Sequence, residues 1–324
     1  MNKSNLAAGV IIIAALVLAI FSVRNDAITT DESPHISAGY SYLTQKDMRL
    51  NPEHPPLIKD LAALPLLFQK LNFDAEHPSW KTNINDQWSF GPHFLYESGN
   101  NPDAIALGAR LAVMLVFVLL GLMVYKWGRE RLGHGPALLA LALTVFSPNI
   151  LAHGRYVTTD VGAALAFLFA IYYFVKFLTE PSKKHLLYAG LAFGLAQLFK
   201  FSLFLLIPFF VLLLAVFYVT KTKQDWAKTA SPKRFGRFGL RFFRYFRALA
   251  VIIVIGYLVV WPVYQFHVWN YPPERQKADT ESILGSFPVR PLAKLDVWMA
   301  DKPLLRPYAQ YLLGLLMVSQ RAGG

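Results

Sequence analysis

Residues 105–125 read IALGARLAVMLVFVLLGLMVY, an apolar stretch of the length that crosses a bilayer as one helix. Arg110 is its one charged residue. Similar apolar stretches recur along the chain, and those expected to span a membrane lie at 6–23, 105–125, 136–152, 158–178, 185–201, 203–219 and 248–266. A last stretch, 304–318, is a short surface helix or the start of another span. The pattern predicts an all-α integral membrane protein, a polytopic helical bundle with about seven or eight spans.

The composition agrees with a membrane protein. Of the 324 residues, 55% are hydrophobic and 16% are charged, whereas about 25% of an average soluble chain is charged. The net charge of +12 would suggest nucleic acid as a partner on a soluble protein, but much of it lies in Lys221–Arg247, between two apolar blocks. The first interpretation of basic segments beside spans is that they set the orientation of the protein in the membrane. Binding of anionic lipid is the main alternative. The chain has no cysteine, which excludes disulfides, thiolate metal sites and a thiol nucleophile.

The basic residues predict which ends of the spans face the cytoplasm. The first apolar stretch is interpreted as an uncleaved signal anchor, because residues 19–24 form a poor cleavage site. The positive-inside rule then places 24–104, 153–157 and 267–303 on the extracytoplasmic side, and the basic loop 220–247 in the cytoplasm. The residues that set this orientation are Lys3, Lys126, Arg129, Arg131, Lys183, Lys184 and the run Lys221–Arg247.

The first outer segment, 24–104, is about 80 residues long, which is too long for a plain connection. Within it, Leu57–Leu71 has one apolar face and predicts a helix lying in the membrane interface. The preceding Pro55-Pro56 suits a helix start. The loop is therefore expected to carry interfacial helices.

The same loop contains the residues with the best prospects for chemistry. Asp31 and Glu32 follow the first apolar stretch, and Asn51-Pro52-Glu53-His54-Pro55-Pro56-Leu57-Ile58-Lys59 comes about twenty positions later. Charge near a bilayer is costly, so residues concentrated there indicate a functional site. For an isolated Asp-Glu pair, a solvated loop start would be the simpler interpretation. The histidine, second glutamate and lysine nearby favour a site.

These motifs resemble a known family. Asp31-Glu32, followed by the 52–57 motif and Lys59, resembles the first outer loop of the GT-C glycosyltransferases that use polyprenyl-phosphate sugars. That group includes the protein O-mannosyltransferases and the aminoarabinose transferases of lipid A, as in glycosyltransferase family 39. The resemblance covers most of the chain, with its specific motifs concentrated in residues 31–160. Further similar positions are Trp88-Ser89-Phe90-Gly91, Arg110, 155–160 and Lys200-Phe201-Ser202.

The resemblance implies transfer of a sugar, mannose or a related one, from a polyprenyl-phosphate donor. The acceptor would be a hydroxyl of a protein, lipid or glycan on the extracytoplasmic face of the plasma membrane, with no nucleic-acid partner. Asp31 resembles the catalytic aspartate, which would take the acceptor proton in a single inverting displacement. Glu32 would orient the acceptor or Asp31. The whole chain, 1–324, would form one multi-pass domain, expected to be truncated at its C-terminus.

Four cations are candidates for contact with the donor phosphate, because transfer needs positive charge for the departing group. They are Lys59, Arg110, Arg155 and Lys200. The alternative for each is a side chain that reaches from a helix end to the headgroups. Lys59 matches the lysine after the family's His-Pro-Pro-Leu, which favours the phosphate role there.

The remaining candidates complete the predicted site. Glu53 matches a family position that contributes to a metal site, so a divalent cation is an expected cofactor, though one Glu-His dipeptide does not make a site. His54 favours the mannosyltransferase branch over the aminoarabinose branch. Asp160 opens a span and recurs near the donor in the family; its simpler role is a carboxylate at a helix N-terminus. Four loop histidines are interpreted as structural: His35, His77, His93 and His153.

Two other interpretations of the protein are alternatives to sugar transfer. A transporter or lipid flippase usually carries charges in mid-membrane on repeated halves, whereas these spans are nearly free of acidic residues and do not repeat. An inactive fragment or a structural membrane partner is the second alternative, because family members usually continue with more spans.

Overall fold

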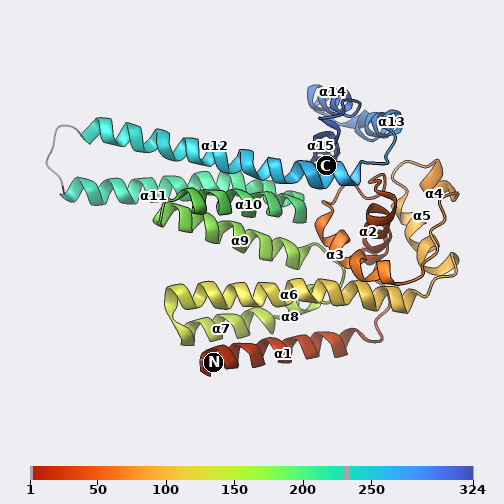
Figure 1. Cartoon of the computed structure of the whole chain (residues 1–324), viewed down its shortest axis with the longest axis horizontal. Helices are drawn as coiled ribbons and strands as arrows, with labels where there is room; N and C mark the ends of the chain where they lie inside the picture. Colours follow the sequence, from red (N-terminus) through yellow and green to blue (C-terminus); the bar gives the residue numbers. More distant parts are fainter. Residues whose placement is uncertain (1–2, 229–233, 324) are drawn as a thin grey trace. The chain divides into compact units, whose positions relative to one another are not determined.

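The computed structural model describes residues 3–228 and 234–323, and within these ranges it contains helices and no strands. The predicted all-α membrane class is confirmed. Among the described residues, five helical segments are long and apolar enough to cross a membrane. They are α1 (Lys3–Val23), α6 (Pro102–Leu132), α9 (Asp160–Thr179), Phe201–Lys221 of the short helix η3 (Phe201–Leu205) and α11 (Leu206–Lys228), and Phe242–His267 of α12 (Arg234–His267) (Figure 1).

Two of the predicted spans form shorter helices. The stretch 136–152 divides into α7 (His134–Val145) and α8 (Pro148–His153). The residue before a proline is disfavoured in helical conformation, and Ser147, before Pro148, is extended with φ −60° and ψ 124°. The stretch 185–201 becomes α10 (Lys183–Phe199), whose 17 residues cover about 25 Å. The predicted total of seven or eight spans therefore exceeds the five segments that meet the length and composition of a span.

The chain divides into two compact units. The first unit comprises residues 1–165, 198–201 and 261–324. In it, α1, α6 and α7 run side by side (Figure 1). Ala19 and Val23 of α1 pack with Met114 of α6, which places the end of α1 beside the helix that follows the long loop.

The long loop of the first unit is largely helical. It contains α2 (Glu32–Gln45), α3 (Leu57–Ala63), α4 (Pro78–Lys81), α5 (Gln87–Pro92) and two short helices, η1 (Leu64–Phe68) and η2 (His93–Glu97). The helix expected over 57–71 starts at Leu57 as predicted, but it tightens at Leu64 and ends at Phe68, while α2 was not expected. The interfacial position of these helices stays a prediction.

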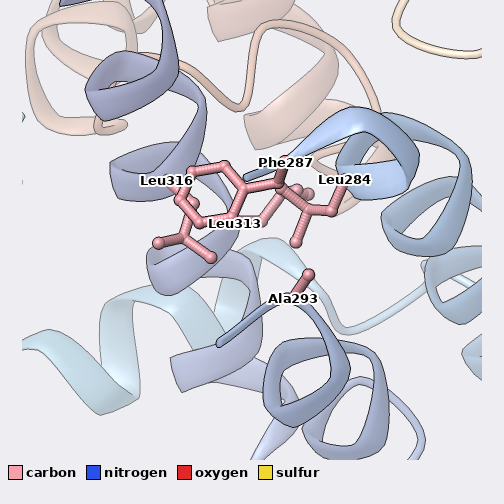
Figure 2. Packing of buried hydrophobic residues seen from close by; sticks show 5 residues of the cluster. All are labelled: Leu284, Phe287, Ala293, Leu313 and Leu316. Carbon is pink, nitrogen blue, oxygen red and sulfur yellow. The ribbon is translucent and has the colours of Figure 1, made fainter. Parts of the chain in front are cut away.

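The C-terminal part of the first unit forms three helices with one apolar core. They are α13 (Pro273–Ile283), α14 (Arg290–Met299) and α15 (Arg306–Gly323), with the short helix η4 (Leu284–Ser286) after α13. Leu284 and Phe287 pack against Leu313 and Leu316 of α15, with Ala293 of α14 beside them (Figure 2). The interrupted stretch 304–318 is therefore helical from Arg306 onward, and the five candidate spans found in the described part of the chain do not include it.

The second unit comprises residues 166–197 and 202–260. Phe174 of α9 stacks on Phe210 of α11 with ring centroids 4.0 Å apart. A Cβ at Gly194 of α10 would lie 2.8 Å from Cβ of Val259, so this glycine allows α10 and α12 to approach closely. The basic segment expected as a loop over 220–247 mostly extends α11 to Lys228 and begins α12 at Arg234, with 229–233 outside the described residues.

Candidate active site

Glu32 and Arg110 form a buried ion pair. Arg110 Nε and Nη2 donate to the two carboxylate oxygens at 2.8 and 2.7 Å, and neither side chain is more than 3% exposed. The backbone N–H groups of Thr29 and Val157 also donate to this carboxylate, at 2.9 and 3.1 Å. Arg110 directs its other donors at the carbonyls of 26–27. The pair thus fixes the start of α2 against α6 and the segment around Val157.

Asp31 is the neighbour of Glu32 and has a different environment. It precedes the first residue of α2, its side chain is exposed, and it makes no hydrogen bond to the helix N-terminus. Within the described residues, no ion pair or side-chain hydrogen bond is formed by this carboxylate. Its negative charge is close enough to raise the pKa of His35, which opposes the larger effect of burial. One of two adjacent carboxylates is therefore free to meet a ligand.

Lys59 lies entirely inside the protein. Its Nζ donates to the Tyr42 hydroxyl at 2.8 Å, to the Asn51 carbonyl at 2.8 Å and to the His54 carbonyl at 2.7 Å. Burial lowers the pKa of Lys59 to about 7, and the carboxylates of Glu53 and Asp60 act against that shift. The lysine therefore holds the 51–54 turn against α2.

Lys59 and Arg110, two of the predicted phosphate contacts, have protein partners in this structure. Both side chains are buried, and their donors are directed at oxygens of the protein itself. The physical reason is that each closes a loop whose backbone carbonyls would otherwise lack donors. In this arrangement both side chains hold loops of the protein, and contact of either one with a donor phosphate stays a prediction.

Glu53 is also enclosed, at 2% exposed. Its Oε1 accepts from Gln87 Nε2 and, at 3.0 Å, from Arg321 Nη2, while its Oε2 accepts from Asn85 Nδ2 at 3.2 Å. Arg321 itself is 61% exposed. The predicted metal ligand therefore has an amide and a guanidinium donor at Oε1 and an amide donor at Oε2, and it brings the end of α15 to the 51–54 turn.

The arrangement around Glu53 does not fit a carboxylate-rich metal centre. No group of three His, Cys, Asp or Glu side chains that could hold a metal ion occurs in the described ranges 3–228 and 234–323. Three donors occupy the Glu53 carboxylate, which leaves a free acceptor position at Oε2 alone. Metal dependence stays a prediction for experiment.

Two histidines meet in the same region. The rings of His35 and His54 lie edge to face, with centroids 5.0 Å apart. His35 Nδ1 lies 2.9 Å from the Val157 carbonyl, so Nδ1 carries the proton and Nε2 the lone pair. Burial lowers the pKa of both rings, that of His54 to about 2, where the nearby His35 and then the charges of Lys59, Lys200 and Arg321 add to the effect. Both imidazoles are neutral at pH 7.

Asp160, Lys200 and Arg155 lie nearer the surface. Lys200 Nζ donates to Asp160 Oδ1 at 2.7 Å, with the two side chains 31% and 48% exposed. Arg155 Nη1 donates to the Ser22 carbonyl at 2.9 Å and lies 3.7 Å from Asp26 Oδ2. The Arg155 side chain is 22% exposed. Lys200 and Arg155 are thus the two predicted phosphate contacts that solvent reaches.

Sequence reasoning missed His35, Tyr42 and Arg321. His35 and Tyr42 are seven positions apart, which places them on one face of α2 and could have signalled a shared role. Arg321 donates to Glu53, which lies 268 positions earlier in the chain, and no sequence pattern predicts a pair at that separation.

Fold and candidate site together describe an all-helical, multi-pass membrane protein with an exposed carboxylate beside a buried ion pair. Residues 102–236 match the family model of the dolichyl-phosphate-mannose-protein mannosyltransferases. The match spans less than half of the chain, and it relates this part of the chain to membrane glycosyltransferases of the GT-C type, with the particular member left open. It includes Arg110 and Lys200 but not Asp31. No curated protein and no solved structure matches the chain.

Proposed function

We propose that this protein transfers a sugar, mannose or a related one, from a polyprenyl phosphate to a hydroxyl of a protein, lipid or glycan. The reaction would take place on the extracytoplasmic face of the plasma membrane. The family model matched by residues 102–236 supports the reaction class. The observation that carries the proposal is that Glu32 is locked by Arg110, while the carboxylate of adjacent Asp31 is exposed and unpaired among the described residues.

The proposed step is a single displacement with Asp31 as general base. The acceptor hydroxyl oxygen attacks the anomeric carbon, and the bond from that carbon to the phosphate oxygen breaks. The phosphate leaves with the electron pair, and Asp31 takes the proton of the attacking hydroxyl. The products are a glycosylated acceptor with inverted configuration and a polyprenyl phosphate.

Lys200 and Arg155 are the proposed phosphate contacts. Cations at the departing group stabilise charge that grows in the transition state. Lys200 keeps a partly exposed ammonium oriented by Asp160, and Arg155 is partly exposed beside Asp26. The buried cations Lys59 and Arg110 act through the loops that they hold.

His54 is proposed to contact the sugar or the acceptor. Its low pKa keeps the ring neutral, so it both donates and accepts a hydrogen bond at pH 7. A neutral ring suits a sugar hydroxyl, which needs both kinds of partner, better than it suits a phosphate.

The test is transfer by purified protein in detergent from defined polyprenyl-phosphate sugars, with mannose as the first donor. Asp31→Asn should reduce the rate by about 100-fold or more, because the amide cannot accept the proton. Asp103→Asn, which changes an exposed carboxylate in the first turn of α6, is the matched control and should keep the rate.

Full transfer by Asp31→Asn, with a normally folded and inserted protein, would overturn the role of Asp31. Absence of transfer from every polyprenyl-phosphate donor by the unaltered protein would remove the proposed function itself. An arm with EDTA tests the metal: loss of transfer that a divalent cation restores would establish metal dependence.

A further inference from the structure

A cavity of about 310 Å³ lies within the second unit, between the start of α10 and α12. Lys183 lines it from the first residue of α10, and Arg244 and Arg247 line it from α12. Phe177, Leu186 and Val251 supply an apolar lining. Ligand pockets in proteins occupy about 300–1,000 Å³, so this space suits a small polar group more than a whole lipid.

The charged groups of this cavity all have one sign. Lys183, Arg244 and Arg247 are exposed, and the cavity lining contains no carboxylate. Among the described residues, none of the three forms an ion pair. Glu180 is the nearest acidic residue in sequence to Lys183, and it does not belong to the lining. Three like charges around one space create a positive potential that attracts an anion.

The apolar side chains indicate what the anion is attached to. Phe177 is 7% exposed and helps to form the cavity, whereas Phe243 and Phe246 of α12 are 71% and 61% exposed. Contact with such apolar surface does not stabilise a bound inorganic anion, whereas it favours the binding of an amphiphile, whose acyl chains leave water.

The position along the helices agrees with a lipid headgroup. The candidate span α9 ends at Thr179, and the span of α12 begins at Phe242. The cations of the cavity therefore lie where two candidate spans end, at the depth of the headgroups, and juxtamembrane cations attract anionic lipids.

We infer that this cavity binds the phosphate of an anionic phospholipid from the surrounding bilayer, between Lys183, Arg244 and Arg247. The inference is independent of the proposed sugar transfer, because these residues belong to a different unit from Asp31.

The test measures lipid binding to the purified full chain by native mass spectrometry in a zwitterionic detergent. Phosphatidylglycerol should bind about tenfold more tightly than phosphatidylcholine, since the two differ in net charge. Arg244→Gln with Arg247→Gln should weaken phosphatidylglycerol binding by about tenfold. Arg244→Lys with Arg247→Lys keeps the charge and should keep the preference for the anionic lipid.

Lys184→Gln is the matched control. Lys184 is adjacent to Lys183 but lies over the Tyr188 ring at 5.7 Å and does not line the cavity. Its variant should keep phosphatidylglycerol binding. Equal binding of both lipids, an equal loss in Lys184→Gln, or displacement of the lipid by millimolar inorganic phosphate would each overturn the inference, the last by identifying a free-phosphate site.

Discussion

At the scale of single residues, Asp31 and Glu32 show that partners decide the role of a carboxylate. The two are adjacent in the chain, and the same chemistry is available to both. Glu32 accepts four hydrogen bonds and is 0% exposed, whereas Asp31 faces solvent. Glu32 is therefore expected to matter for stability, and Asp31 for reaction.

The first prediction concerns the buried pair. Glu32→Gln should lower the free energy of unfolding by about 3–5 kcal/mol, because it leaves Arg110 buried without an opposite charge. Thermal unfolding of the purified protein in detergent measures the change. Glu76→Gln removes the exposed partner of Lys81 and should leave the melting temperature nearly unchanged. Equal effects of the two substitutions would contradict the structural role of Glu32.

The second prediction concerns pH and Lys59. Burial holds its folded pKa at about 7, below the value of about 10.4 for a free lysine, so the unfolded chain binds more protons between these values. The contribution of Lys59 to the free energy of unfolding therefore rises with pH across this window. Lys59→Met should reduce the upward slope of the melting temperature between about pH 8.5 and 9.5.

The range from about pH 8.5 to 9.5 lies above the pKa of a second buried group, Asp296, whose titration also affects stability. Burial raises the pKa of Asp296 to about 8, so its contribution to stability falls as pH rises from about 4 to 8 and has the opposite sign. Lys70→Met, at an exposed lysine of the same loop, is the control and should keep the slope of the unaltered protein. An unchanged slope in Lys59→Met would count against a neutralised Lys59.

At the scale of elements, the site depends on how closely α2 and α3 approach. A Cβ on Gly39 of α2 would lie 2.7 Å from the carbonyl carbon of Lys59 and closer still to its oxygen. Backbone cannot move aside as a flexible side chain can. Gly39 thus sets the spacing at which Lys59 Nζ reaches Tyr42 and the 51–54 turn.

The third prediction follows from this contact. Gly39→Ala should destabilise the protein by about 1–3 kcal/mol through overpacking. It should also lower transfer activity, since α2 begins beside Asp31. Gly9→Ala, in α1 with open space around the added methyl, should be neutral or stabilising. Thermal unfolding and transfer assays of both variants measure the difference; a Gly39→Ala variant that behaves like Gly9→Ala would refute the close contact.

At the scale of the whole molecule, the orientation in the membrane determines which side each functional region faces. The basic residues predict which ends of the helices share a side, with 136–152 and 185–201 counted among the membrane crossings. The predicted orientation puts the α2–α5 loop outside and the start of α10 inside. Sugar transfer at Asp31 and lipid binding at Lys183 would then take place at opposite faces.

The fourth prediction tests this orientation. The chain has no cysteine, so a single introduced cysteine reports its own side without background. Glu97→Cys should react with an impermeant maleimide on intact cells, and Ser182→Cys only after the membrane is permeabilised, because basic ends stay in the cytoplasm. The reverse labelling would invert the topology and remove Asp31 from the extracytoplasmic face.

The sequence by itself determined the all-α membrane class, the approximate position of the spans and the start of α3 after Pro55-Pro56. These depend on local properties: the length of an apolar run, and the geometry of proline. Only the tertiary structure decided that Arg110 and Lys59 hold loops, that Arg321 meets Glu53, and that Asp31 is left unpaired among the described residues. Partners 78 or 268 positions apart leave no local pattern, because a salt bridge depends on where the folded chain brings two charges together.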